Sequence, residues 1–442
     1  MATLYIPALL GQGRQPKAEA AYQKQLWNPR KSVVLMAWPL MIAFFIFAAI
    51  FSTDSLISSS AVDDGHSDTL PPSIGSSIST QDNITPPPWP DSNVTKLIDL
   101  SVGGCNIWRG DWIPHPHEPP YTNTTCAHIQ EAENCMKLGR PDSDYLYWRW
   151  KPYDCELPLF DAKAFLKIVA GKKWAFIGDS LARNNFQSVV CHLAVVEKLE
   201  CVYNVDGVSG NIRCYVGSYN FTIATAWAPF LVKGEGFVEG VDKLDLDVVD
   251  DNWASLVHDY DYIVLSAGRW YMRTSVYFVQ NELVGCFNCR MSNTTDVGAG
   301  FAYKAALRTT FDFLIASKYK GVVFFRTFSP DHWRNGSWDR GGTCTQKAPF
   351  RSSATAFDGL SQFIYPMQLE EFGKIVQRSS EYSFKLQLLD TIHAAVLRPD
   401  AHPGAYGLKP NSRAQSDCAH WCLPGAVDAW SAMILHALKH LS

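Results

Sequence analysis

The chain has 442 residues, of which 47% are hydrophobic, and its formal net charge is −4. This length has room for one large domain or two ordinary ones, and the apolar content is enough for a substantial core. The slight negative charge gives no signal for a protein that binds nucleic acid or another polyanion.

The first predicted element is a single transmembrane helix at residues 33–51, which read VVLMAWPLMIAFFIFAAIF and carry no charge. About 20 apolar residues span a bilayer as a helix. Basic residues precede the segment and acidic residues follow it, so the positive-inside rule predicts a cytosolic tail at 1–32 and a lumenal remainder. The alternative, a cleaved signal peptide, usually has an apolar core of about 7–15 residues nearer the start of the chain.

Two further signals favour a lumenal location. Asn-x-Ser/Thr sequons follow the anchor and are candidate glycosylation sites, at Asn83, Asn93, Asn123, Asn220, Asn293 and Asn335. All 12 cysteines also follow the anchor, which is typical of an oxidising compartment. The spacings Cys286-x-x-Cys289 and Cys418-x-x-x-Cys422 would also suit zinc, but the secretory context favours disulfides. We therefore predict no metal site.

The rest of the chain divides into a stem and a globular region. Residues 52–104 are rich in Ser, Thr, Pro and Asp and show no hydrophobic periodicity, which predicts a disordered stem. Residues 105–442 read as one lumenal domain without a second linker. Within it, residues 105–170 are dense in Trp, Pro and Cys and predict a small irregular lobe pinned by disulfides.

Residues 171–442 show strands alternating with helices. We predict strands at 174–178, 262–267, 322–326 and 386–390, and helices at about 181–196, 301–317 and 427–441. Such alternation favours an α/β core in which helices cover both faces of a parallel sheet.

The stretch FIGDSLARNN, residues 176–185, places Ser180 just after a predicted strand and at the start of a helix. Ligands of open α/β sheets bind beyond the carboxyl ends of the strands, and a helix N-terminus favours negative charge. Ser180 is therefore either a nucleophile beside an oxyanion site or simply the N-cap of its helix. The stretch alone does not decide between these interpretations.

A serine nucleophile needs a base, and the best candidate is His420 in Asp417-Cys-Ala-His420-Trp-Cys422. An Asp three residues earlier can orient the imidazole, which leaves the other ring nitrogen free to face Ser180. The flanking cysteines would keep such a loop rigid. His115 and His117 in IPHPHEPP are rival bases, although their proline-rich context is more typical of surface or binding residues.

Gly-Asp-Ser after a strand, with Asp-x-x-His near the C-terminus, resembles the SGNH/GDSL esterase fold. Longer stretches resemble the plant trichome birefringence-like family of polysaccharide O-acetyltransferases, from about Cys105 to the end. They include CNIWRGDWIP (105–114), YTNTTC (121–126), NCMKLGRPDSDYLYWRWKPYDCELPLFD (134–161), FFRTFSPDHWRNGSWDRGGTC (324–344) and DCAHWCLPGAVDAW (417–430). The form GRPDSDYLYWRWKP is most similar to the branch that acetylates xyloglucan.

This resemblance implies Ser180 as nucleophile, His420 as base and Asp417 as the acid that orients it. It also implies four disulfides: Cys105–Cys155, Cys126–Cys191, Cys135–Cys422 and Cys344–Cys418. The last two would tie the Asp417/His420 loop to the small lobe and to the loop after the strand at 322–326. For the remaining cysteines we expect Cys201–Cys214 and Cys286–Cys289.

In the SGNH fold that the chain resembles, a Gly and an Asn usually complete the oxyanion hole. Gly268, just after the strand at 262–267, fits the Gly, whereas the standard Asn block is missing. Asn184 is a candidate for the second donor, and the alternative role for it is to anchor the start of the helix. Arg183, Arg326 and His332 are expected to contact substrate.

The motifs do not say whether water or a sugar hydroxyl accepts the acyl group. The resemblance implies an O-acetyltransferase that modifies a plant hemicellulose, with xyloglucan first and xylan or mannan as alternatives. A polysaccharide acetyl esterase and a non-catalytic wall-polysaccharide binding protein are the other hypotheses. No glycine loop that cradles a nucleotide is evident, so we expect no bound cofactor but a required acetyl donor, acetyl-CoA or another carrier.

The expected setting is the Golgi membrane, with a single-pass type II topology and the catalytic domain in the lumen. The expected partners are a polysaccharide acceptor, the membrane itself and membrane proteins that supply acetyl donor. No nucleic acid partner is expected.

Overall fold

The computed structural model describes residues 100–238, 240–289, 291, 293–352, 357, 359–407 and 416–441. The predicted tail, the membrane anchor and nearly all of the stem lie outside these residues, so they stay predictions. Within the described ranges, no helix combines the length and apolarity that crossing a bilayer requires.

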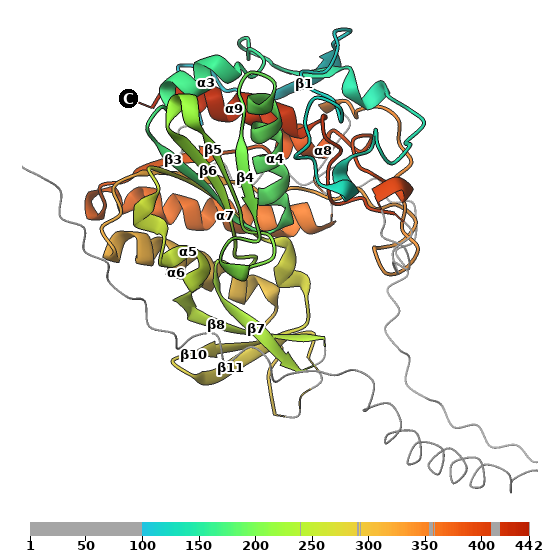
Figure 1. The fold of residues 1–442 in the computed structure, drawn as a ribbon. Helices are drawn as coiled ribbons and strands as arrows, with labels where there is room; N and C mark the ends of the chain where they lie inside the picture. Colours follow the sequence, from blue (N-terminus) through green and yellow to red (C-terminus); the bar gives the residue numbers. More distant parts are fainter. Residues whose placement is uncertain are drawn as a thin grey trace, which may run out of the picture. The chain divides into compact units, whose positions relative to one another are not determined.

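A mixed sheet forms the centre of the described region (Figure 1). Its seven strands lie in the order β13-β12-β9-β3-β6-β5-β4. The bounds are β3 (Lys173–Gly178), β4 (Glu200–Tyr203), β5 (Ile212–Val216), β6 (Phe221–Trp227), β9 (Tyr262–Ser266), β12 (Val322–Arg326) and β13 (Lys385–Leu389). The four predicted strands are confirmed as β3, β9, β12 and β13.

The prediction of a wholly parallel sheet is corrected. The strands from β13 to β6 run parallel, but β5 is antiparallel to β6 and β4 is antiparallel to β5. Short connections join β4, β5 and β6, and a short connection can only pair neighbouring strands in the antiparallel sense.

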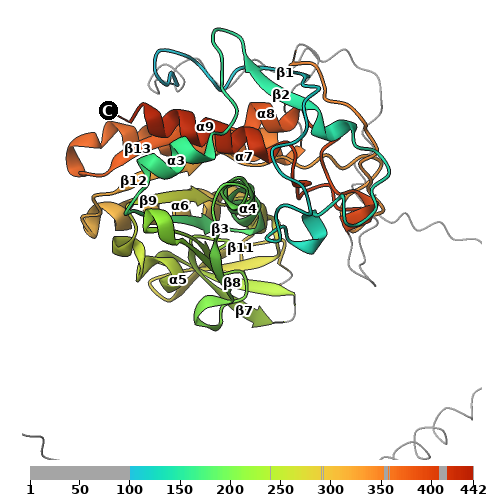
Figure 2. The same ribbon diagram turned by 45° about the horizontal axis from the view of Figure 1, so that its top comes forward.

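Helices cover both faces of this sheet, as predicted (Figure 2). Alternate side chains of β3 enter two separate cores: Trp174 and Phe176 one, Ala175 and Ile177 the other. The longer helices are α3 (Ala162–Ile168) with α4 (Ser180–Ala194) and α9 (Val427–Lys439) on the first core, and α6 (Ala299–Ala316) with α7 (Gly359–Gln377) on the second. Helix α7 was not predicted, and it contains Pro366, a residue that normally interrupts helices.

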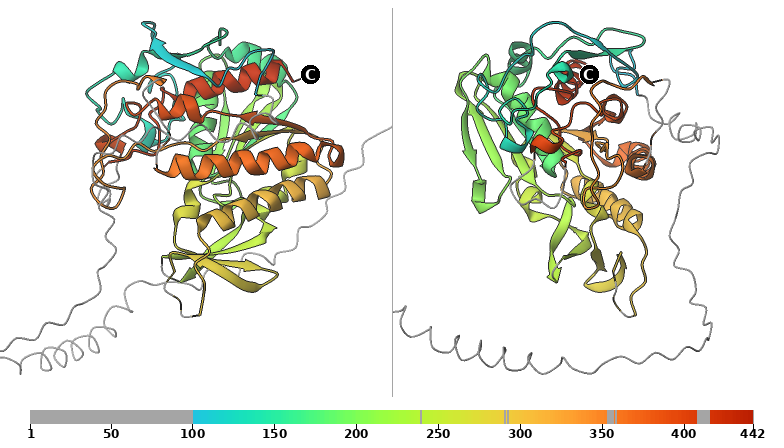
Figure 3. Two further views of the ribbon diagram at one scale, coloured as in Figure 1. Left: turned by 180° about the vertical axis from the view of Figure 1, so that it is seen from behind. Right: turned by 90° about the vertical axis from the view of Figure 1, so that its right-hand side faces the viewer.

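A second sheet, also not predicted, lies beside α6 (Figure 3). Within the described residues it has four strands in the order β11-β10-β8-β7. These are β7 (Val232–Val238), β8 (Val241–Val249), β10 (Ser275–Val279) and β11 (Glu282–Phe287). The alternation of Leu and Asp in β8, LDLDV, is the period-two signal that could have revealed it.

The small lobe contains more regular structure than predicted. Strands β1 (Gly110–Pro114) and β2 (Trp148–Pro152) form an antiparallel pair, and short 3-10 helices lie between them. The Cys105–Cys155 disulfide lies within the lobe. Cys126–Cys191 connects the lobe to α4, and Cys135–Cys422 connects it to the Asp417/His420 loop.

All 12 cysteines lie in the described part of the chain, and every one is in a disulfide. Cys344 pairs with Cys418, as the resemblance implies. The two pairs expected for the remaining cysteines, Cys201–Cys214 and Cys286–Cys289, are also present. These pairings leave no thiolate to bind zinc, so the zinc alternative is wrong.

The sequons that the structure describes lie at accessible positions. Asn220, Asn293 and Asn335 are exposed and Asn123 is half-buried. Asn83 and Asn93 lie outside the described residues. Glycosylation of these asparagines stays a prediction.

Candidate active site

Ser180 is presented at a sharp junction between β3 and α4. Helix α4 begins at Ser180, and the preceding Asp179 is its N-cap, because its carboxylate accepts the N–H of Leu181 at 2.9 Å. The capping role therefore belongs to Asp179, and Ser180 is free for another function. Gly178 has φ 150°, and a Cβ there would lie 1.8 Å from the carbonyl oxygen of Ser266 on β9. Only glycine fits this position.

The structure brings Ser180, His420 and Asp417 together. The Ser180 Oγ lies 2.7 Å from Nε2 of His420, and Nδ1 of the same ring lies 2.8 Å from Oδ2 of Asp417. Because an ionised carboxylate only accepts, Nδ1 carries the proton and donates to Asp417. The Nε2 lone pair then faces the Ser180 hydroxyl, which donates to it. This is the arrangement in which an imidazole can remove a serine proton.

The local electrostatics keep Asp417 ionised. Burial would raise the pKa of Asp417, but His420 and the N–H groups of Ala419 and His420 hold this pKa well below its usual range. Burial likewise lowers the pKa of His420, but the Asp417 carboxylate outweighs it and the net shift is upward. The carboxylate can therefore stabilise an imidazolium when His420 takes up a proton.

Asn184 fastens the His420 loop to α4. Its side-chain oxygen accepts the Trp421 N–H at 2.9 Å, and its NH₂ group donates to the Trp421 carbonyl at 3.3 Å. The indole N–H of Trp421 donates to Ser329 at 2.8 Å. The amide of Asn184 is thus occupied by the loop, which corrects its assignment as an oxyanion donor.

Gly268 stays a candidate oxyanion donor. It lies two residues beyond Ser266, which pairs with Gly178 across β9 and β3. Gly268 and Ser180 are therefore at the same edge of the sheet. The backbone of Gly268 has φ 155°, and a Cβ there would meet Phe328 at 3.1 Å. A side chain at this position would be strained and crowded.

Two of the three residues expected to contact substrate are buried against other groups of the chain. Arg326 is 1% exposed, donates to Ser266 and lies over the ring of Trp430, and burial lowers its pKa to about 10. His332 is also buried, with its ring directed at His402 and a main-chain carbonyl. Both predictions are corrected, because residue type alone does not reveal burial. Arg183 is half-buried over Trp227 and stays a candidate.

The rival histidines lie at a different place. His115 and His117 line a cavity of about 280 Å³ together with aromatic residues of β1 and β2 and the start of α9. Ser180, Asp417 and His420 are not among its described lining residues. The ring that contacts Ser180 belongs to His420.

Sequence reasoning missed Glu133, which the small lobe contributes behind the His420 loop. Its carbonyl accepts the Leu423 N–H at 3.0 Å, and its carboxyl group is buried with one oxygen unpaired among the described residues. Burial raises the pKa of Glu133 to about 7, although His420 and Arg183 oppose the shift. The implied Cys135–Cys422 disulfide was the signal that could have placed this segment here.

This raised pKa predicts a pH-dependent effect of Glu133→Gln. As pH rises from about 4.5 to 7, the unfolded chain ionises Glu133 before the folded chain does, so the native state loses stability. Gln cannot ionise, so the substitution should raise the free energy of unfolding by about 3 kcal/mol above pH 7 and leave it nearly unchanged at pH 4. Urea unfolding at both pH values measures this.

Glu131→Gln is the matched control, since Glu131 lies on the same short helix with 75% of its side chain exposed. It should change the stability little at either pH. Equal stabilisation by Glu133→Gln at both pH values would contradict the raised pKa.

The described residues hold no group of three or more His, Cys, Asp or Glu side chains placed to bind a metal ion. The chemistry available at this site from the described residues is that of a serine, an imidazole, a carboxylate and backbone donors.

Comparison with known proteins agrees with this geometry. Residues 157–437 match PC-Esterase, a GDSL/SGNH-like acyl-esterase family found in Pmr5 and Cas1p, and residues 103–156 match the PMR5 N-terminal domain. Protein trichome birefringence-like 26 of Arabidopsis thaliana is 40% identical over 79% of this chain and 80% of its own length.

The chain is also similar to two proteins that are named xyloglucan O-acetyltransferases. Xyloglucan O-acetyltransferase 4 of Populus trichocarpa is 39% identical over 76% of this chain and 81% of its own length. Xyloglucan O-acetyltransferase 2 of Arabidopsis thaliana is 36% identical over 79% of this chain and 86% of its own length. Both domains are matched, and these identities extend over most of the chain. The chain therefore belongs to the trichome birefringence-like family, with a PMR5 N-terminal domain followed by a PC-Esterase domain.

Proposed function

We propose that this chain is a polysaccharide O-acetyltransferase that carries the acetyl group on Ser180. The observation that carries the proposal is the hydrogen-bonded array of Ser180, His420 and Asp417 at the N-terminus of α4. Membership of an acyl-esterase family supports acyl chemistry at this serine, and the names of two relatives support transfer to a sugar.

In the first half of the reaction, His420 Nε2 takes the Ser180 proton while Oγ attacks the carbonyl carbon of the acetyl donor. The negative charge of the tetrahedral intermediate falls near the N-terminus of α4, whose N–H groups and dipole stabilise it. The intermediate then collapses, and His420 returns the proton to the leaving group. Ser180 is left as an acetyl ester.

In the second half, a sugar hydroxyl attacks the acetyl-serine and gives its proton to His420. Collapse of this second intermediate breaks the bond to Ser180, and the His420 proton returns to Oγ. Asp417 keeps the imidazole in the required tautomer throughout and stabilises its cationic form. Water in place of the sugar would make the enzyme an esterase.

Xyloglucan is the proposed acceptor, because two of the similar proteins carry it in their names. Xylan and mannan are the alternative acceptors, and a non-catalytic wall-polysaccharide binding protein is the alternative without chemistry. The proposed donor is acetyl-CoA or another acetyl carrier, supplied by membrane proteins.

The test is acetyl transfer by the full chain from labelled acetyl-CoA to oligosaccharides of xyloglucan, xylan and mannan. We expect label on xyloglucan oligosaccharides, and faster donor consumption with this acceptor than without it. Release of labelled acetate at a rate independent of acceptor would favour the esterase. Binding of an oligosaccharide with neither transfer nor hydrolysis would favour the binding protein.

We also propose that residues 33–51 anchor the chain in the Golgi membrane with the catalytic domain in the lumen. The uncharged 19-residue run and the basic residues before it support this topology. Protease added to sealed Golgi vesicles should leave the domain intact and digest it once detergent is present. Digestion in intact vesicles, or a secreted form cut near Phe51, would contradict the anchor.

A further inference from the structure

A chain of buried hydrogen bonds ends on the peptide group between Ala267 and Gly268. The backbone N–H of Phe328 donates to Oε1 of Gln368 at 2.7 Å. The Nε2 group of Gln368 donates to the Tyr303 hydroxyl at 2.8 Å, and this hydroxyl donates to the Ala267 carbonyl at 2.9 Å. Tyr303 on α6 is 1% exposed and Gln368 on α7 is fully buried, so water does not compete for these bonds.

Each hydrogen in this chain of bonds has one possible direction. A backbone N–H only donates, so the Gln368 atom that meets Phe328 is the amide oxygen, and the NH₂ group faces Tyr303. A carbonyl oxygen only accepts, so the Tyr303 hydroxyl directs its single hydrogen at Ala267. Burial raises the pKa of Tyr303 well above its usual value, and the hydroxyl therefore keeps this hydrogen at neutral and acidic pH.

These bonds fix the direction of the Gly268 N–H. The peptide between Ala267 and Gly268 is trans, so its C=O and N–H groups point in opposite directions. The carbonyl faces Tyr303, which belongs to the core on the α6 side of the sheet. The N–H therefore points away from that core and toward the side on which α4 packs. No described residue accepts this N–H.

The same edge of the sheet carries Ser180. Strands β9 and β3 are neighbours, and Ser266 of β9 pairs with Gly178 of β3. Gly268 and Ser180 each lie two residues beyond that pair. A free N–H at this place is suited to the negatively charged oxygen of a tetrahedral intermediate formed on Ser180.

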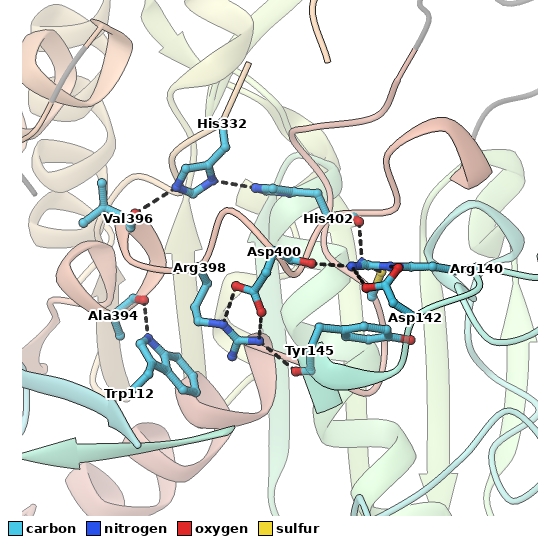
Figure 4. A network of polar contacts seen from close by, with 11 residues as sticks. Trp112, Arg140, Asp142, Tyr145, His332, Ala394, Val396, Arg398, Asp400 and His402 are labelled. Carbon is cyan, nitrogen blue, oxygen red and sulfur yellow. Dashed lines mark hydrogen bonds and ion pairs between the residues drawn. The ribbon is translucent and has the colours of Figure 1, made fainter. Parts of the chain in front are cut away.

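The base is held by a different set of buried contacts. Arg140 of the small lobe donates to the His402 carbonyl at 2.8 Å (Figure 4). The ring of His402 contacts the His420 carbonyl at 2.6 Å. These contacts do not include Tyr303 or Gln368, so the Gly268 peptide can be disturbed while the base stays in place.

We propose that Tyr303 and Gln368 are positioning residues that orient the Gly268 N–H toward the oxyanion formed on Ser180. The proposal rests on the proposed acetyl-serine chemistry. The Tyr303 hydroxyl prevents rotation of the peptide by holding its carbonyl, and Gln368 holds the hydroxyl. Without the hydroxyl, the carbonyl loses its partner and the N–H is no longer fixed in one direction.

Tyr303→Phe tests this role, because it removes only the hydroxyl group. Loss of a whole oxyanion donor lowers kcat by about 100- to 1,000-fold. Here the donor stays and only its orientation is released, so we expect kcat of acetyl transfer to fall about tenfold. The KM values for acetyl-CoA and for the acceptor should change little. The pH dependence of kcat should keep its midpoint, since His420 is untouched.

Tyr319→Phe is the matched control. Tyr319 is 2% exposed, and its hydroxyl donates at 3.0 Å to the carbonyl of Tyr260, which precedes β9 at the opposite end of that strand. Both variants lose a buried bond from a tyrosine hydroxyl to a carbonyl, so both should lower the melting temperature. Only Tyr303→Phe should lower kcat per folded enzyme. An unchanged kcat in Tyr303→Phe, or an equal fall in both variants, would overturn the proposal.

A second measurement on the full chain needs no transfer to a sugar. In the reaction with a fluorophosphonate probe, a nucleophilic serine oxygen displaces fluoride from phosphorus, and a phosphonyl oxygen takes the place of the acetyl oxygen. The rate of attachment to Ser180, read by peptide mass mapping, should fall in Tyr303→Phe and stay near that of the wild type in Tyr319→Phe. Equal rates in the wild type and in Tyr303→Phe would overturn the positioning role.

The same measurement separates this proposal from the proposed function. Slower labelling of Tyr303→Phe in a chain that transfers no acetyl group to any oligosaccharide would support the positioning role and refute only the transferase. A wild type whose Ser180 is not labelled at all would refute the nucleophile and, with it, the role of Tyr303 and Gln368.

Discussion

Replacing Ser180 with Ala is expected to lower the rate of acetyl transfer by about ten-thousand-fold or more, because the attacking oxygen is lost. The fold should persist, since Asp179 and not Ser180 caps α4. Labelled acetyl-CoA without acceptor should leave one acetyl group on the wild type, and peptide mass mapping should place it on Ser180. The Ser180→Ala protein should gain none there.

Ser188→Ala is the matched control, because Ser188 lies on the same helix and bonds Asp428 and Ser431 instead. Its rate should stay near that of the wild type. His420→Ala should match the loss in Ser180→Ala, and the combined variant should lose little more, since the two residues act as one unit. The acetyl-serine mechanism would be falsified if folded Ser180→Ala protein, free of wild type, transferred acetyl groups at a near-normal rate.

Removing the Cys135–Cys422 disulfide by a double Ser substitution should be the most damaging change outside the reacting groups. This bond spans 287 residues of chain and joins the small lobe to the residue two positions after His420. Loss of a native disulfide typically lowers the free energy of unfolding by about 2–5 kcal/mol. Activity should fall as well, because the His420 loop loses one of its two covalent anchors. Denaturant unfolding and transfer assays measure the two effects.

The Cys286–Cys289 pair provides the comparison. It closes a separation of only three residues at the end of β11, within the four-stranded sheet. A double Ser substitution there should cost less stability and leave transfer nearly unchanged. Equal losses of activity from both double variants would show that the Cys135–Cys422 bond has no special role in holding the base.

Local sequence was enough to predict the elements on which the site is built. The apolar runs of β3, β9 and β12 are continuous because helices cover both faces of the sheet. Such runs can be recognised from the sequence alone. The turn at Gly178 and the spacing of Asp417 and His420 are equally local, so they made Ser180 and His420 candidates, and the family resemblance then implied the roles of Ser180, His420 and Asp417. The alternation of Leu and Asp in β8 is a local signal of the same kind, because it has the period of two that is typical of a strand.

Tertiary structure decided which polar residues meet at the candidate site and which are buried in the fold. Arg326 and His332 have the chemistry of substrate ligands and Asn184 that of an oxyanion donor, yet each is buried against partners on other elements of the chain. Glu133 looks like an ordinary acidic residue until burial near His420 raises its pKa. A residue's letter determines what bonds it can form. Its exposure and its partners depend on contacts between distant segments, and only the folded chain creates those contacts.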